Sequence, residues 1–173
     1  APTILNPHLS QGTKDYIAAR CCTEPLMTVD NEGKFSPVLA AEVPSTSNGG
    51  VSPDGKVVTY KLKPGVKWAD GQAFSADDVA FTFEFISNKE SSAVTAGTYA
   101  NIDKVEAVDP GTVKITFKEP TGGWFVPFVG TNGQILPKHI MKDFVGAKSR
   151  EAPLNTKLIG TGPYMVEDFK PGD

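Results

Sequence analysis

The run from Ser52 to Val79 constrains the fold of this chain more than any other part of the sequence. It contains Asp54-Gly55 and Asp70-Gly71, two pairs that are typical of tight turns. Between these turns, residues 57–63 alternate apolar and polar side chains, which is the period-2 pattern of a half-buried strand. Ser75-Ala76-Asp77-Asp78 then has the pattern of a helix start, with an acidic residue three positions after the capping serine. The run therefore predicts strand, turn and helix in an α/β chain.

The same criteria predict the remaining elements. The sequence holds 17 glycines and 14 prolines, so turns should be frequent and helices few and short. We expect a mixed α+β sheet, a β-hairpin over 102–118, either a helix or a strand over 124–129, and irregular chain over 145–157. Further helices are predicted at 15–22 and 138–144, and further strands at 26–30, 66–68 and 164–166.

Composition excludes several classes of protein. Lys and Arg together number 17 against 20 Asp and Glu, a formal net charge of -3, which gives no general attraction to nucleic acid. We therefore expect no nucleic acid partner. Hydrophobic residues make up 39% and charged residues 21% of the chain, which is typical of a folded domain and not of a disordered tail. No apolar run approaches the roughly 20 residues that span a bilayer.

The two cysteines, Cys21 and Cys22, are adjacent in the sequence. We expect both to be small buried side chains, because free cysteine is usually buried. A strained disulfide between these neighbours is the alternative, although the geometry of neighbouring side chains disfavours it. His8 and His139 lie far from the cysteines in sequence and show no zinc spacing. We therefore predict no metal site.

No group of residues predicts a reaction or a cofactor. Asp77-Asp78 is the obvious carboxylate pair, but such a pair also suits the positive end of a helix dipole. Neither His8 nor His139 has a serine or cysteine in a nucleophile elbow to match it. Trp68 and Trp124 could stack on a ligand, although tryptophans more often close a core. We therefore expect no catalytic residue and no cofactor.

The run from Ser52 to Val79 also resembles the signature of the family 5 extracellular solute-binding proteins. These are the dipeptide-, oligopeptide- and nickel-binding receptors of ABC importers. The signature has a D-G turn, an alternating strand, a second turn, a W/F-x-D-G turn and a T/S-A-x-D-V helix start, all present here in order. Shorter matches flank it on both sides, at Leu5-Asn6-Pro7, Glu24-Pro25-Leu26, Val38-Leu39-Ala40, Ile135-Leu136-Pro137-Lys138-His139 and Gly160-Thr161-Gly162-Pro163-Tyr164.

The resemblance implies a periplasmic-binding-protein-like fold of class II, in the cluster that has an extra inserted domain. It places residues 1–42 and 156–173 in a partial lobe I, and residues 43–155 in a smaller inserted α+β domain. The family's opening strand and the part that follows G-T-G-P-Y have no counterpart here, so we expect an N-terminal fragment of a longer receptor. An incomplete lobe would expose apolar surface, and a dimer of the fragment could cover it.

The resemblance also implies a function. Family members bind a peptide or another small solute between two lobes and deliver it to an ABC permease in the membrane. We therefore expect a binding protein and not an enzyme, periplasmic or extracellular and anchored as a lipoprotein in its full-length form. Backbone groups in such receptors pair with an extended peptide as an added strand does. The residues implied to face the ligand are Cys22, Thr23, Glu24, Pro25, Leu26, Asn132 and Gln134, with Thr23 and Glu24 favoured for polar contacts.

Three alternatives remain open from the sequence. The solute could be an oligosaccharide or a metal chelate, although the presence of only two histidines disfavours direct nickel ligation. The chain could be a stand-alone domain that binds a protein through an exposed sheet edge. It could also be a small hydrolase that uses Cys22 or a carboxylate pair. Ordinary loop packing is the competing explanation for each candidate ligand contact.

Overall fold

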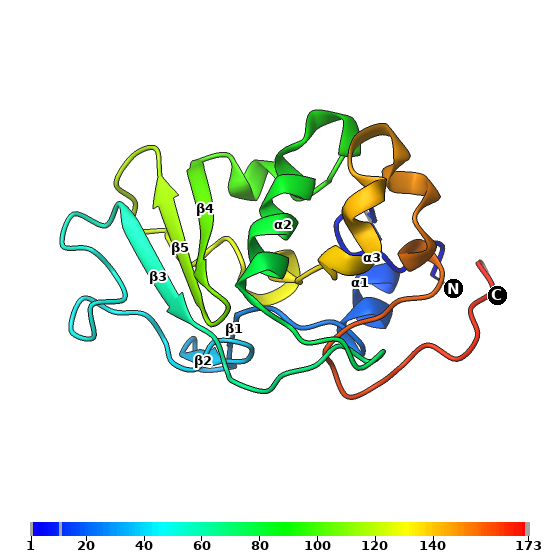
Figure 1. The fold of residues 1–173 in the computed structure, drawn as a ribbon, viewed down its shortest axis with the longest axis horizontal. Coiled ribbons are helices and arrows are strands. Elements are labelled where there is room, and N and C mark those ends of the chain that lie inside the picture. The colour runs from blue at the N-terminus through cyan, green and yellow to red at the C-terminus, as the bar shows by residue number, and fades with distance from the viewer. Residues whose placement is uncertain (1, 11, 172–173) are drawn as a thin grey trace.

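The computed structural model describes residues 2–10 and 12–171. Its main sheet has three antiparallel strands in the order β3-β5-β4, formed by Val57–Lys61, Thr112–Phe117 and Ile102–Asp109 (Figure 1). β4 and β5 form the predicted hairpin, and β3 pairs with β5 on its other side. The alternation in β3 is confirmed, because Val58 and Tyr60 are buried, Thr59 between them is half-buried and Lys61 is exposed.

Helix α2, Ala76–Ser87, covers one face of this sheet, where it packs against β4 and β5 (Figure 1). This helix has apolar side chains on two sides. Val79 and Ile86 are buried on one stripe, and Phe81 and Phe85 on the other. A helix that is apolar on two sides is expected between a sheet and a second layer. α2 has that position, because it also contacts α3.

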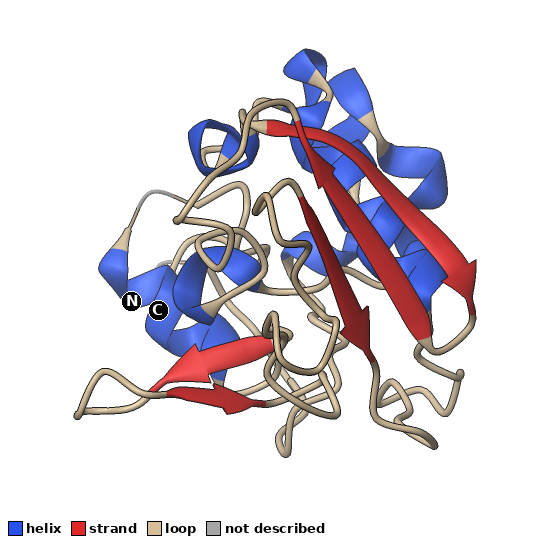
Figure 2. Cartoon of the chain, turned by 90° about the vertical axis from the view of Figure 1, so that its left-hand side faces the viewer, coloured by secondary structure: helices blue, strands red, loops and turns tan. Residues whose placement is uncertain are grey.

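A second, smaller sheet pairs β1, Met27–Val29, with β2, Phe35–Pro37, as an antiparallel hairpin (Figure 2). Gly33 lies in the turn between them with a φ of 80°, a conformation that glycine adopts without strain. Helices α1, Thr13–Arg20, and α3, Lys138–Met141, lie together on the opposite side of α2 from the main sheet (Figure 1). The sequence predicted β1 but not β2.

Single-turn helices account for much of the remaining chain. The prediction of irregular chain over 145–157 is wrong, because two 3-10 helices form within it. Proline and glycine allow these short pieces where a longer helix cannot continue. The 3-10 helices are Lys89–Ser91, Ala96–Tyr99, Gly130–Gly133, Lys142–Phe144, Gly146–Glu151 and Pro153–Asn155.

Three other predicted elements do not form. Residues 66–68 form one isolated bridge, between Lys67 and Ala73, and not a strand. Trp68 in this segment is buried in the core, at 2% exposure. Residues 124–129 form turns instead of a helix or strand. Residues 164–166 have no regular secondary structure and pair with no strand in the described part of the chain, and a strand needs a partner for its backbone groups.

The prediction that both cysteines are buried holds for Cys22 and is wrong for Cys21. α1 ends at Arg20, and the face that carries Ile17 and Cys21 points to solvent, with Ile17 at 64% exposure. Free cysteine is usually buried, but whether a given one is buried depends on which face of the helix packs against the rest of the protein. Both thiols are free, so the disulfide between neighbours is not formed.

Exposed apolar side chains occur where an incomplete lobe was expected. Tyr164 and Met165 are 66% and 72% exposed. The division of the chain at 42/43 and 155/156, and dimer formation through such surface, stay predictions. Among the residues described, no helix combines the length and the apolar character that crossing a membrane requires.

Candidate ligand-binding site

Three segments that are far apart in the sequence meet around the predicted ligand-facing residues. They are residues 22–26, residues 128–134, named here the 128–134 loop, and residues 160–162. Pro25 forms an antiparallel bridge with Gln134, and the Leu26 amide donates to the Phe128 carbonyl at 3.0 Å. The structure thus brings the two predicted groups, 22–26 and 132–134, into direct contact.

The third segment fits against the first through glycine. The Gly162 amide donates a hydrogen bond to the Cys22 carbonyl at 2.8 Å. A Cβ atom on Gly160 would lie 1.9 Å from the same carbonyl oxygen. The Gly160 carbonyl in turn accepts from the Ala69 amide at 2.9 Å. The two glycines of the G-T-G-P-Y motif are therefore needed because backbone lies directly on backbone here.

The 128–134 loop is folded tightly on itself. Phe128 is fully buried and has a φ of 62°, a left-handed conformation that is uncommon for a residue with a side chain. A Cβ atom on Gly133 would lie 2.1 Å from the carbonyl carbon of Phe128. Backbone held in such a conformation costs on the order of 1–3 kcal/mol and persists only where surrounding contacts fix it.

Tyr99 supplies one of these contacts. Its hydroxyl donates to the Asn132 carbonyl at 2.8 Å and accepts from the Phe128 amide at 3.3 Å, so it joins the start of the loop at Phe128 to Asn132. The Tyr99 and Phe128 rings pack edge to face with centroids 5.0 Å apart. Burial raises the pKa of Tyr99, so its hydroxyl keeps the proton that it donates.

His8 supplies the second contact and is fully buried. Its Nε2 lies 2.7 Å from the Gln134 carbonyl oxygen, and its Nδ1 lies 2.8 Å from Thr95 Oγ1. Burial lowers the pKa of His8 to about 4, and this outweighs the hydrogen bond to the Gln134 carbonyl, which acts in the opposite direction. The imidazole is therefore neutral at pH 7.

This depressed pKa gives the protein a predictable response to acid. In the unfolded chain the pKa of His8 is about 6.5, and in the folded protein it is about 4. Between these two pH values the unfolded state therefore binds a proton at His8 that the folded state does not bind. The stabilisation is complete above pH 6.5 and is lost as the pH falls towards 4. A difference of this size corresponds to about 3 kcal/mol. Urea unfolding from pH 7 to 4 should show this extra loss in the native protein and not in His8→Gln. Parallel curves for the two proteins would contradict the prediction.

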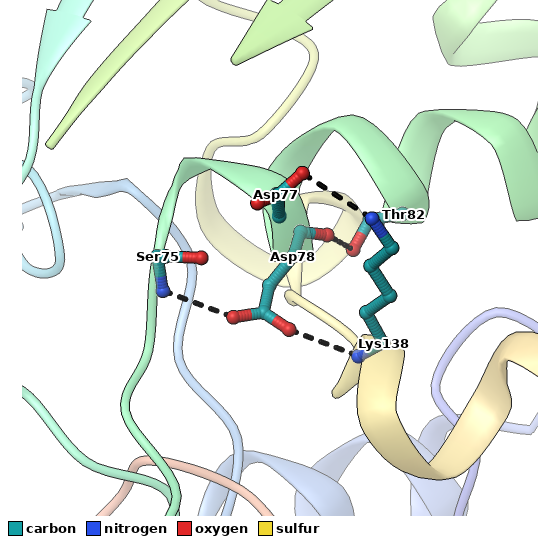
Figure 3. Close-up of polar contacts among 5 residues, drawn as sticks. All are labelled: Ser75, Asp77, Asp78, Thr82 and Lys138. Atoms are coloured by element: carbon teal, nitrogen blue, oxygen red, sulfur yellow. Dashed lines mark hydrogen bonds and ion pairs between the residues drawn. The ribbon is translucent and has the colours of Figure 1, made fainter. Parts of the chain in front are cut away.

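A buried carboxylate connects the signature motifs to the site. Asp78 accepts from the Ser75 amide at 3.0 Å and from the Lys138 amide at 2.9 Å (Figure 3), and from Trp68 Nε1 at 3.3 Å. The bond from the Ser75 backbone is the one that a capping box forms, at the helix start that the spacing of these two residues predicted. Burial raises the pKa of Asp78, although these three hydrogen bonds act in the opposite direction.

Thr82 extends this connection one turn along α2. Its hydroxyl donates to the Asp78 carbonyl at 2.7 Å (Figure 3). The same hydroxyl accepts from the Leu136 amide at 2.9 Å. The ion pair between Lys138 and Asp77, at 3.2 Å, is exposed and contributes little. Together, Asp78 and Thr82 fix the chain that leaves the 128–134 loop on the first turns of α2. The helix start at Ser75 and the P-K-H turn, which are far apart in the sequence, are thus joined by direct hydrogen bonds.

Two of the predicted site residues use their polar side chains inside the protein. The Thr23 hydroxyl donates to the Ala19 carbonyl at 2.9 Å, which closes the end of α1. Gln134 Nε2 donates to the Gly130 carbonyl at 2.7 Å. Both residues are buried, at 3% and 2% exposure, and these two donor groups are already used within the chain.

Glu24 and Asn132 are different. Glu24 is half-buried and Asn132 is exposed, and within the described chain neither side chain has a hydrogen-bond or ion-pair partner. Their backbone carbonyls are used, by the Ile135 amide and by Tyr99 respectively. Of the predicted residues, these two have polar side chains available to a ligand.

The backbone of residues 24–26 is also largely occupied. The Pro25 carbonyl accepts from the Leu39 amide at 3.3 Å, and the Leu26 carbonyl accepts from the Val38 and Ala40 amides, each at 3.0 Å. Strand addition by a peptide needs unpaired backbone groups along an edge. At these residues we therefore expect contacts from side chains and not an added strand.

A hollow of about 660 Å³ lies beside this region. It is lined by the chain on both sides of the G-T-G-P-Y turn and by the W-A-D-G turn, including Ala69, Leu158 and Tyr164. No group of three or more His, Cys, Asp or Glu residues suitable for a metal ion occurs in the part of the chain that the structure describes. Sequence reasoning missed His8 and Tyr99 as supports of the site. The position of His8 directly after Leu5-Asn6-Pro7 was the available signal.

Comparisons with known proteins agree with this architecture. The model of the bacterial extracellular solute-binding proteins, family 5 (middle), matches residues 34–173. The chain belongs to this family. Its fold is mixed α/β of the class II periplasmic-binding-protein type, as the resemblance predicted.

Individual relatives cover the whole chain. The glutathione-binding protein GsiB of Shigella boydii is 31% identical over 99% of this chain. The substrate-binding protein CtaP of the Listeria monocytogenes ABC transporter is 29% identical with a TM-score of 0.83 over 100% of the chain. The oligopeptide-binding protein AppA of Bacillus subtilis, solved with a nonapeptide, is 26% identical with a TM-score of 0.87 over 99%. The chain spans 31% of the length of GsiB and 33% of each of the two solved chains.

Proposed function

We propose that the complete protein binds a peptide or a related small solute and delivers it to an ABC permease, as a transport receptor and not an enzyme. The observation that carries this proposal is the junction of residues 22–26 with the 128–134 loop, which leaves Glu24 and Asn132 available on a rigid support. Membership of family 5 supports it, together with the peptide-binding and glutathione-binding relatives.

We infer that Glu24 pairs with a cationic group of the solute, such as a peptide α-amino group. The Glu24 carboxylate is half-buried and has no partner in the described chain, so it is free to pair with a charge that a ligand supplies. An ionised carboxylate and an ammonium form the stronger class of hydrogen bond. Asn132, with one acceptor and two donor positions, suits the peptide groups of the same solute.

Thermal-shift measurements on the complete protein test the proposed function. Glutathione, mixed peptides of two to nine residues, and oligosaccharides are the three probes. We expect a rise in the midpoint with at least one peptide pool, because a ligand that binds only the folded state stabilises it by mass action. A rise with oligosaccharides alone would favour the oligosaccharide-binding alternative. No shift with any of the three would contradict a receptor of this kind.

The role of Glu24 is tested separately with the peptide that gives the largest shift. We expect Glu24→Gln to raise the Kd about 10- to 100-fold, since a charge-assisted hydrogen bond contributes about 1.5–3 kcal/mol. Glu119→Gln is the matched control, because Glu119 is exposed and lies outside the site. Isothermal titration calorimetry provides the measurement. An unchanged Kd in Glu24→Gln would remove Glu24 from the site.

The proposal also covers location and organisation. We propose that the complete protein is periplasmic or extracellular and carries a lipoprotein anchor. We also propose that residues 1–42 and 156–173 belong to one lobe and residues 43–155 to an inserted domain. Cell fractionation with and without removal of the lipid anchor tests the first point. Recovery in the cytoplasmic fraction would contradict it.

A further inference from the structure

We propose that His8 is a positioning residue, which sets the direction of the Gln134 backbone and so holds the 128–134 loop ready for the solute. This inference rests on the proposed function for its consequence in binding. The structural part, the control of the loop by His8, stands on the contacts of the chain alone.

The hydrogen bonds of His8 allow only one tautomer. A backbone carbonyl can only accept, so the Nε2 that lies 2.7 Å from the Gln134 oxygen must carry the proton. Nδ1 is then the acceptor, and the Thr95 hydroxyl, 2.8 Å away, must donate to it. His8 therefore has a fixed donor aimed at the loop, and Thr95 fixes the ring that carries it.

The supports of the loop come from one short stretch of chain. Thr95 immediately precedes the 3-10 helix Ala96–Tyr99, and Tyr99 is its last residue. The Val94 amide also donates to the His8 carbonyl at 2.9 Å, which attaches this stretch to the N-terminal segment. Tyr99 holds the loop at Asn132, and His8 holds it two residues later at Gln134. Two buried side chains thus hold the loop through its backbone carbonyls, at Asn132 and at Gln134.

The loop requires this support because its own conformation is strained. Phe128 has a left-handed backbone, and Gly133 lies too close to Phe128 for any side chain. Without the His8 donor, the buried Gln134 carbonyl would lose its partner, and the loop could relax towards less strained conformations. Asn132 and the neighbouring Glu24 would then no longer be held in one arrangement, and the solute would have to order them on binding.

The first test needs no variant and no ligand. In the complete protein labelled with ¹⁵N-histidine, we expect His8 to show a protonated Nε2 and an unprotonated Nδ1 throughout pH 5 to 8. The opposite tautomer, or a charged ring in this range, would overturn the proposal. This signature distinguishes the stated role from simple filling of the core, which does not depend on the tautomer.

The second test measures the loop. In His8→Leu we expect amide hydrogen exchange of residues 130–135 to become about tenfold faster, while exchange in α2 stays as in the native protein. His8→Gln should recover most of the protection, because its amide supplies a donor near the position of Nε2. His139→Gln is the control for changing the other histidine. Unchanged exchange in the loop, or an equal acceleration throughout the chain, would overturn the proposal.

If His8→Leu fails to fold, Thr95→Val provides the same exchange measurement, because it removes only the donor that orients the ring. The effect on binding is measured with the peptide that raises the thermal midpoint of the native protein. We expect about a tenfold higher Kd in His8→Leu and near-native affinity in His8→Gln. An unchanged Kd would overturn positioning while leaving the receptor function intact. Absence of binding in the native protein would instead contradict the proposed function, and the exchange result would still decide the role of His8.

Discussion

Gly160→Ala should reduce the free energy of unfolding by at least about 4 kcal/mol, which is among the largest effects that a single substitution produces. The added Cβ would lie 1.9 Å from the Cys22 carbonyl oxygen and 2.6 Å from its carbonyl carbon. Both are backbone atoms, so no side chain can move aside to relieve the clash. Either the G-T-G-P-Y turn or the end of α1 must shift, and the hydrogen bond from Gly162 to Cys22 is lost with it.

Urea unfolding of the complete protein measures this effect. Gly122→Ala is the matched control, since a Cβ at Gly122 would meet nothing within 4 Å and its backbone does not have a positive φ. The control should unfold within about 0.5 kcal/mol of the native protein, as exposed substitutions usually do. If Gly160→Ala unfolded with the same midpoint as Gly122→Ala, the close packing of these two segments would be wrong.

Gly133→Ala should have a similar effect on stability and a larger effect on binding. Its Cβ would lie 2.1 Å from the carbonyl carbon of Phe128 and 2.6 Å from the Phe128 Cα, again backbone atoms. The 128–134 loop would have to open, which removes the hydrogen bonds that the Tyr99 hydroxyl makes with Phe128 and Asn132. We expect a loss of at least about 4 kcal/mol in stability, and loss of detectable binding in whatever fraction remains folded.

Gly130→Ala in the same loop provides a graded comparison. Gly130 has a φ of 57° but open space around its Cβ position, so alanine there incurs only the left-handed strain, about 1–2 kcal/mol. Urea unfolding should therefore give a much lower stability for Gly133→Ala than for Gly130→Ala, and calorimetric titration should give weaker binding. Equal stabilities would mean that the loop is not packed on itself as described.

The elements that the sequence predicted correctly are those with a local cause. The alternation in residues 57–63, the Ser75 to Asp78 spacing and the hairpin over 102–118 each contain the pattern that forms them. The prediction of a strand at 164–166 was wrong because a strand forms only with a partner strand, which its own residues do not specify. Cys21 failed for a related reason, since helical spacing shows which residues share a face but not which face is buried.

The candidate site shows the same division. The sequence, through its resemblance to a family, placed Glu24 and Asn132 among the candidate ligand contacts, and the structure leaves both side chains available within the described chain. It also placed Thr23 and Gln134 among these candidates, but the Thr23 hydroxyl bonds to Ala19 and the Gln134 side-chain amide bonds to Gly130. The type of a residue indicates what it can bond to, but only its neighbours decide whether that capacity is already used.

The turns, the capped helix, the alternating strands and the family can all be predicted from the sequence, because each follows from residues that are close together or from motifs in a fixed order. The support of the 128–134 loop by His8 and Tyr99 becomes visible only in the folded chain. His8 is 126 positions from Gln134, and Tyr99 is 33 positions from Asn132. The physical reason is that hydrogen bonds and close backbone contacts act through space, and no local pattern along the chain encodes which distant carbonyl a buried side chain will reach.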